Sequence, residues 1–158
     1  MAEAVALPEE VKAKTKVLIF LGEHCPYPGV DHVGQQHLEY PTNYYIIRVL
    51  APVIIPERLY MKAFEEGFDG IIVATCGTDC PYPGAYEQTS ARINRVYQLM
   101  KERGIDSRRL RLTAICSVCA HAFLKEVAQM NQVMAELGPL ERPLPPAGAS
   151  QEEKGDES

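Results

Sequence analysis

The stretch DGIIVATCGTDCPYPGAYEQTSARINRVYQLMKERG, residues 69–104, indicates the fold class of this chain. It begins with a near-continuous apolar run, residues 70–76, of the kind that forms a strand covered on both faces of a sheet. Apolar side chains then recur at helical spacing over residues 86–103, and Gly104 ends the pattern. A buried strand followed by an amphipathic helix is the repeating unit of α/β folds with parallel sheets.

The same alternation continues on both sides of this stretch. Further apolar runs predict strands at residues 16–22, 44–50 and 110–116. Further helical patterns predict helices at residues 56–66 and from Ala120 to Leu137, where Gly138 and Pro139 end the pattern and Ser117 is a candidate cap. Residues 25–41 predict at most a short, poorly defined helix. We therefore predict a three-layer α/β sandwich with a four-stranded parallel sheet, of the Rossmann or flavodoxin-like class.

The 158 residues are enough for one domain. We predict an N-terminal extension over residues 1–15, the α/β domain over 16–138, and a flexible acidic, proline-rich tail over 139–158. The net charge of −5 argues against non-specific binding to nucleic acid. No apolar run reaches the roughly 18 residues of a membrane span, and no signal peptide is recognisable. We therefore expect a cytoplasmic protein.

The cysteines all fall at or just after the ends of predicted strands, and they are Cys25, Cys76, Cys80, Cys116 and Cys119. Because parallel strands end at the same edge of a sheet, we expect these side chains to gather there. In a cytosolic chain they suggest a metal, redox or nucleophile role rather than structural disulfides. The pairs Cys76-x3-Cys80 and Cys116-x2-Cys119 offer four thiolates to one centre, with Cys25 as a fifth candidate.

The pentapeptide CPYPG occurs twice, at residues 25–29 and 80–84. Proline fixes φ and glycine permits a sharp turn, so each copy predicts a rigid loop that holds a cysteine at the surface with a tyrosine over it. His24 and His121 lie close to cysteines in the sequence. Both are most simply solvated, although either could tune or ligate a metal centre.

Three hypotheses follow for this set of residues. The leading one is an electron-transfer subunit with one iron–sulfur cluster. The second is an interaction module that is stabilised by a four-cysteine zinc site. The third is a thiol enzyme, with Cys116 and Cys119 as a dithiol or with Cys25 as a nucleophile beside His24. It ranks last because it leaves Cys76 and Cys80 unexplained.

Residues 64–112 resemble the central block of the delta subunit of methyl-viologen-reducing hydrogenase, and the resemblance extends over residues 16–139. It is carried by G-x-D-G at 67–70, D-C-x-Y at 79–82, GID-x-x-RL at 104–110 and C-x-Y-x-G-x-D at 25–31. It implies a cytoplasmic electron-transfer subunit of anaerobic metabolism with an iron–sulfur cluster of the [2Fe–2S] type. Its partners would be a hydrogenase or dehydrogenase and a heterodisulfide-reductase-type flavin or iron–sulfur subunit. The implied ligands are Cys25, Cys76 and Cys80.

The chain departs from the family pattern at several cysteine positions. The resemblance leads us to expect cysteines where Leu21, Gly22 and Ala51 stand, and small polar residues where Cys116 and Cys119 stand. We interpret this difference as a relocated ligand set. In the alternative, a different centre has replaced the cluster.

Overall fold

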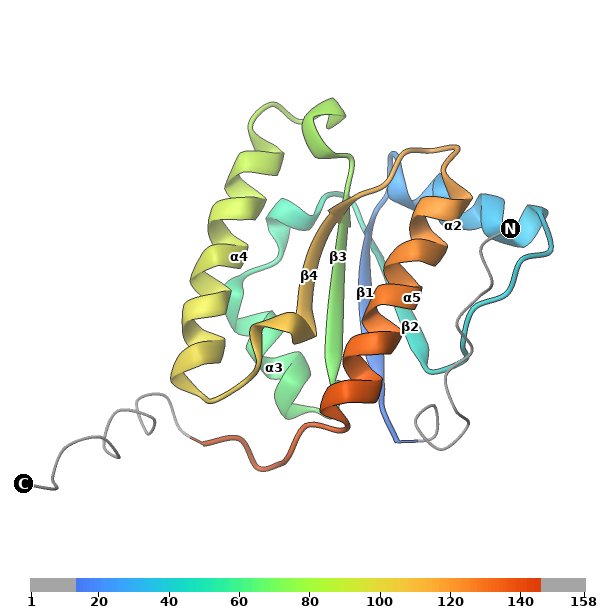
Figure 1. Ribbon diagram of the computed structural model, residues 1–158. Helices are drawn as coiled ribbons and strands as arrows, with labels where there is room; N and C mark the ends of the chain where they lie inside the picture. Colours follow the sequence, from blue (N-terminus) through green and yellow to red (C-terminus); the bar gives the residue numbers. More distant parts are fainter. Residues whose placement is uncertain (1–13, 146–158) are drawn as a thin grey trace, which may run out of the picture.

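The fold is described by a computed structural model over residues 14–145 (Figure 1). All but two residues of the predicted N-terminal extension lie outside this range. Four parallel strands form one sheet in the order β2-β1-β3-β4. They are β1 (Val17–Gly22), β2 (Tyr44–Val49), β3 (Gly70–Thr75) and β4 (Leu110–Ala114). Across the sheet, Val17 lies opposite Tyr44 on one side and opposite Gly70 on the other.

Helices cover both faces of the sheet (Figure 1). One layer contains α2 (Pro26–Gln35) and α5 (Ala120–Leu137), and the other contains α3 (Glu57–Glu65) and α4 (Ala85–Glu102). Short 3₁₀ helices stand in the connections: η1 (Pro52–Ile54), η2 (Gly77–Asp79) and η3 (Ser107–Arg109). The predicted three-layer sandwich with its parallel sheet is confirmed.

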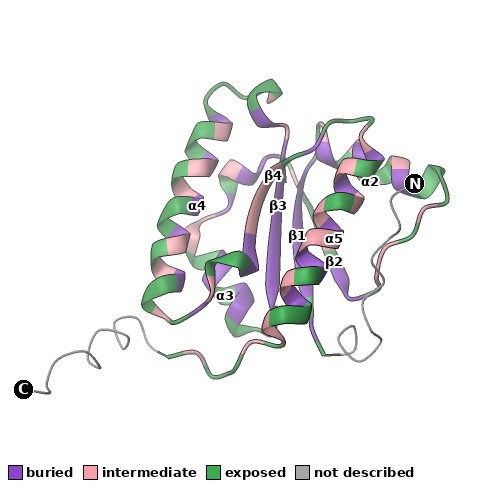
Figure 2. Ribbon diagram, in the orientation of Figure 1, coloured by how far each residue is buried: buried purple, intermediate pink, exposed green. Residues whose placement is uncertain are grey.

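The two central strands are the most buried elements, as Figure 2 shows. Every residue of β1 and β3 is buried, which is why both read as unbroken apolar runs in the sequence. The edge strand β2 is more open, and Tyr45 and Ile47 are each 46% exposed. No helix in the described part of the chain has both the length and the apolar character needed to cross a membrane.

Helix α2 is longer and better defined than the sequence predicted. Its ten residues begin at Pro26, whose fixed φ suits the first position of a helix. Gly29 and Val33 are buried on the face toward the sheet. Helix α5 begins at Ala120 as predicted, but its N-cap is Cys119 and not Ser117.

The C-terminal segment of residues 139–145 packs against the domain, where the sequence predicted a flexible tail. Asp69, which is 2% exposed, accepts hydrogen bonds from the backbone N–H groups of Lys16 and Leu140, each at 2.8 Å. Arg142 forms an ion pair with the same carboxylate at 3.2 Å. Residues 139–145 therefore belong to the folded body, and the rest of the predicted tail lies outside the described residues.

Candidate cysteine site

The five cysteines lie at the carboxyl edge of the sheet, which is at the top of Figure 1. Cys25 follows β1 and is the N-cap of α2, and Cys76 comes directly after β3. Cys116 stands two residues after β4, and Cys119 is the N-cap of α5. The strands that carry Cys76 and Cys116 are hydrogen-bonded neighbours. The sheet therefore brings together residues that are far apart in the sequence.

Three of these cysteines are free thiols, and they form one cluster that we call the three-thiol group: Cys25, Cys76 and Cys80. The pKa of Cys76 is raised to about 12, chiefly because burial disfavours the thiolate and then because of a hydrogen bond with the Cys25 thiol. A hydrogen bond from the Cys25 backbone acts in the opposite direction, and nearby Cys80 adds a smaller charge effect. Loops after two adjacent strands thus place three sulfurs close together.

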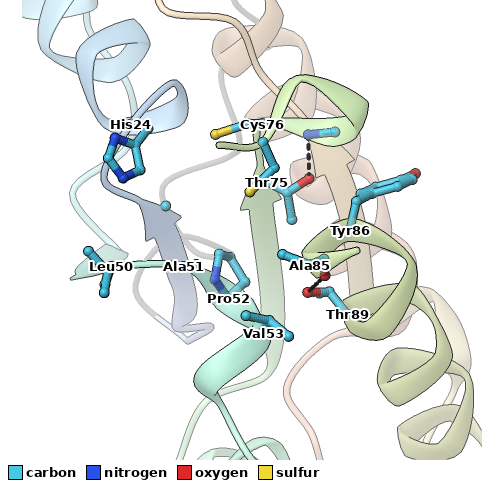
Figure 3. A pocket seen from close by; sticks show the side chains of 13 residues that line it. His24, Leu50, Ala51, Pro52, Val53, Thr75, Cys76, Ala85, Tyr86 and Thr89 are labelled. Carbon is cyan, nitrogen blue, oxygen red and sulfur yellow. Dashed lines mark hydrogen bonds between the residues drawn. The ribbon is translucent and has the colours of Figure 1, made fainter. Parts of the chain in front are cut away.

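A small pocket borders this group (Figure 3). His24 and Cys76 lie above Leu50, Ala51 and Pro52, with α4 on the other side. The cavity holds only about 10 Å³, roughly the space of one water molecule and far below that of a small-molecule site.

The positions where the resemblance predicted additional cysteines contribute no donor here. Gly22 and Ala51 line the same pocket as Cys76 and Cys80. Leu21 is completely buried in β1, within the core on the α2 and α5 side of the sheet. Apolar or side-chain-free residues therefore stand where further ligands were expected.

The two CPYPG copies adopt different structures, although both were predicted as loops. In the first copy, residues 26–29 form the first turn of α2, whereas residues 81–84 form a turn that leads into α4. Gly84 has a φ of +73°, a conformation that favours glycine. The copies are linked by His24, whose Nε2 is 3.1 Å from the hydroxyl of Tyr82. His24 therefore contacts the second copy while it borders the pocket.

Cys116 and Cys119 are joined by a disulfide, with their Cα atoms 5.2 Å apart. The four-thiolate set Cys76, Cys80, Cys116 and Cys119 is therefore not assembled in this structure, because bonded sulfurs are not thiolates. Among residues 14–145, no group of three or more His, Cys, Asp or Glu side chains is arranged to hold a metal ion. His121 is exposed on the first turn of α5.

Comparison with known families finds one that matches most of the chain. The family model described as the delta subunit of methyl-viologen-reducing hydrogenase matches residues 17–138. This chain belongs to that family. The match spans the whole α/β body from the first residue of β1 to the end of α5, so the resemblance in the sequence is confirmed.

Relatives of this family member include subunits of two kinds. It is 30% identical over 125 residues to a subunit of the ferredoxin:CoB-CoM heterodisulfide reductase of Methanosarcina mazei, a match that covers 78% of this chain and 16% of that protein. It is 32% identical over 96 residues to the iron-sulfur subunit of the vhc F420-non-reducing hydrogenase of Methanococcus voltae, over 60% of this chain and 67% of the relative. The iron-sulfur subunit of the F420-non-reducing hydrogenase of Archaeoglobus profundus is 26% identical over 117 residues, which cover 73% of this chain and 85% of that relative. The chain thus spans about a sixth of the length of its heterodisulfide reductase relative.

The thiols of this family member are the type of ligand that an iron–sulfur cluster takes, but fewer than four of them are free. Thiolates are the ligands that such clusters take, but the three-thiol group offers three thiols where a [2Fe–2S] cluster takes four, and the described residues are not arranged to hold a metal ion. His24, which borders the pocket beside Cys76 and Cys80, is a further candidate donor. In this structure the chain does not present a complete four-cysteine cluster site.

One residue that shapes the site was missed by the sequence reasoning. Thr75 Oγ1 accepts a hydrogen bond from the Gly77 backbone N–H at 3.0 Å and donates one to the Thr113 carbonyl at 3.2 Å. It fixes the start of the loop that carries Cys76 and Cys80, and ties it to β4. Threonine is common in strands, so nothing in the apolar run marked this residue.

Proposed function

We propose that this chain is an electron-transfer subunit of a larger redox complex and carries an iron–sulfur cluster at the three-thiol group. The observation that carries the proposal is the clustering of Cys25, Cys76 and Cys80 on adjacent loops in a member of the hydrogenase delta-subunit family. Two relatives are named iron-sulfur subunits of a hydrogenase, and another belongs to a heterodisulfide reductase. When bound, a [2Fe–2S] cluster supplies one-electron transfer.

The partners that fit this role are redox proteins on either side of the electron path. By analogy with the relatives, a hydrogenase or dehydrogenase would deliver electrons and a heterodisulfide-reductase-type subunit would take them. The residues of this chain would hold the cluster at the carboxyl edge of the sheet, where the loops reach the surface. Cys25, Cys76 and Cys80 are each partly exposed there, which leaves the group accessible to solvent.

Iron and acid-labile sulfide in anaerobically purified and reconstituted protein test this proposal, together with an EPR spectrum after dithionite reduction. We expect iron and sulfide in comparable amounts and a reduced-cluster signal. Cys76→Ser should lose most of the iron, because Cys76 is hydrogen-bonded to Cys25 and lies near enough to Cys80 to feel its charge. Circular dichroism checks that the variant keeps its fold.

The matched control is the double variant Cys116→Ser/Cys119→Ser, which removes the disulfide but leaves the three-thiol group intact. We expect it to keep its iron. Loss of iron in this variant would return Cys116 and Cys119 to the ligand set that the sequence predicted. Colourless protein without iron after reconstitution, or stoichiometric zinc without sulfide, would overturn the proposal, and the second result would favour the zinc alternative.

A further inference from the structure

The disulfide between Cys116 and Cys119 includes no member of the three-thiol group. Neither residue lines the pocket that Cys76 and Cys80 border. The two cysteines are only three positions apart, and they connect β4 to α5. A loop this short removes little entropy from the unfolded chain, so the bond is a weak structural cross-link. Its stabilising effect alone does not account for a disulfide at this edge.

The two cysteine residues differ in their exposure to solvent. Cys116 is exposed, together with Ser117 and Val118, and Val118 is 75% exposed. Cys119 is partly buried where the chain enters α5. An incoming thiolate therefore reaches the sulfur of Cys116 more readily than that of Cys119.

The position of Cys119 suits a leaving thiolate. It is the N-cap of an 18-residue helix, whose first turn contains no acidic residue. The first N–H groups of a helix have no intrahelical acceptor, and together with the helix dipole they favour a negative charge at this end. Thiols at helix N-termini have lowered pKa values, and a thiolate of lower pKa leaves faster in exchange reactions.

We propose that Cys116 and Cys119 form a redox-active pair that undergoes two-electron exchange with a dithiol. A thiolate of the dithiol attacks Cys116 Sγ, the S–S bond breaks, and its electron pair moves to Cys119 Sγ. The second thiol of the dithiol then loses its proton and attacks the mixed disulfide, which releases Cys116 as a thiolate. The dithiol leaves as a disulfide, having given two electrons and two protons to the cysteine pair and the solvent.

Mass spectrometry of alkylated tryptic peptides can follow the redox state of this pair separately from that of the other cysteines. Trypsin cuts after Arg111 and Lys125, so residues 112–125 form one peptide that contains Cys116 and Cys119 and no other cysteine. The native full-length chain is equilibrated with mixtures of reduced and oxidised dithiothreitol and then alkylated. We expect this peptide to change reversibly between the disulfide and the doubly alkylated form. A pair that never forms the disulfide, or that is reduced only when the protein unfolds, would overturn the proposal.

Single variants test the roles of the two sulfurs. Reduced Cys119→Ser, treated with 5,5′-dithiobis(2-nitrobenzoate), should keep a stable adduct on Cys116, because no neighbouring thiol resolves it. In the reduced wild type the same adduct should be short-lived. An equally long-lived adduct in the wild type would contradict the assigned roles.

The role of the N-terminal end of α5 in stabilising the leaving thiolate is tested by adding a negative charge to the helix. His121→Glu adds a negative charge to the exposed first turn of α5, and Gln132→Glu adds the same charge farther along the exposed side of the helix. We expect His121→Glu to slow reduction by dithiothreitol about two- to fivefold, with little effect from Gln132→Glu. Equal rates in both variants would exclude a role for the helix end. None of these readouts depends on iron content, so the pair and the cluster proposal succeed or fail separately.

Discussion

Gly29 is the residue that allows α2 to approach the loop after β4. A Cβ atom at this position would lie 2.5 Å from the carbonyl oxygen of Cys116 and 3.2 Å from Cγ2 of Ile115. The first distance is too short for any real contact, and a backbone carbonyl cannot move away as a flexible side chain can. The absence of a side chain therefore lets the helix that begins after Cys25 pack against the segment that carries Cys116.

Gly29→Ala should lower the free energy of unfolding by about 1–3 kcal/mol, since the helix or the loop has to shift. The control is Gly34→Ala in the same helix, where a Cβ would meet no atom of the described residues within 4 Å. That change should be neutral or stabilising by up to about 1 kcal/mol, because alanine favours a helix over glycine. Urea denaturation measures both variants. Equal effects would show that the contact with Cys116 does not limit packing.

Asp69 joins elements at the end of the sheet opposite the cysteines. Its carboxylate connects the residue before β1, through the Lys16 backbone, with the segment after α5, through Leu140 and Arg142. Arg109 adds a hydrogen bond to the backbone carbonyl of Asp69 at 3.0 Å. One buried carboxylate thus fixes the start of the sheet and the segment of residues 139–145.

Replacing this carboxylate should loosen all of these elements together. Asp69→Asn removes the ion pair with Arg142 and presents an amide donor toward groups that are themselves donors. We expect a loss of about 2–4 kcal/mol in the free energy of unfolding. Asp31→Asn is the control, because Asp31 is exposed and an asparagine there still accepts the hydrogen bond from Gln35. Thermal melts compare the two, and equal melting temperatures would refute a structural role for Asp69.

On the scale of the whole molecule, each of the two cores contains a buried tyrosine. Tyr44 donates its hydroxyl to Asn131 Oδ1 at 2.5 Å in the core beneath α2 and α5. Tyr60, in the core beneath α3 and α4, has a buried hydroxyl that finds no hydrogen-bond partner among residues 14–145. Burial raises the pKa of both side chains, since neither hydroxyl ionises easily away from water. Ionisation of either tyrosine therefore opposes folding.

The raised pKa values of the two tyrosines predict how stability depends on pH. The different hydrogen bonding of their hydroxyls predicts the effects of two matched substitutions. Because the folded-state pKa values lie above the unfolded value of about 10, stability is fully present below pH 10 and decreases as the pH rises further. Tyr44→Phe should cost about 1–3 kcal/mol at neutral pH, because it leaves buried acceptors unpaired. Tyr60→Phe should be neutral or stabilising by up to about 1 kcal/mol. Urea denaturation at pH 7 and pH 10.5 measures these effects, and an equal loss in both variants would contradict this interpretation.

The sequence by itself determined the sheet, most of the helices and the edge at which the cysteines gather. Burial on both faces of β1 and β3 requires unbroken apolar runs, and one-sided burial of α4 and α5 requires helical periodicity. Both patterns can be recognised within a short stretch of sequence. Helix α2 was underestimated, because its proline and glycine residues are also typical of loops. Strand ends place Cys25, Cys76 and Cys116 at one edge of any parallel sheet, whatever the details of packing.

The tertiary structure alone decided which cysteines are free and which are disulfide-bonded, and how residues 139–145 pack against the domain. Sequence spacing cannot tell a ligand from a disulfide partner, since this depends on distances across the edge, where Cys25 meets Cys76 while Cys116 bonds to Cys119. Identical CPYPG segments formed a helical turn and a loop, because their neighbours differ. Residues 139–145 were held by Asp69, which is about 70 positions away in the sequence. Contacts between distant residues arise only on folding, and no local pattern encodes them.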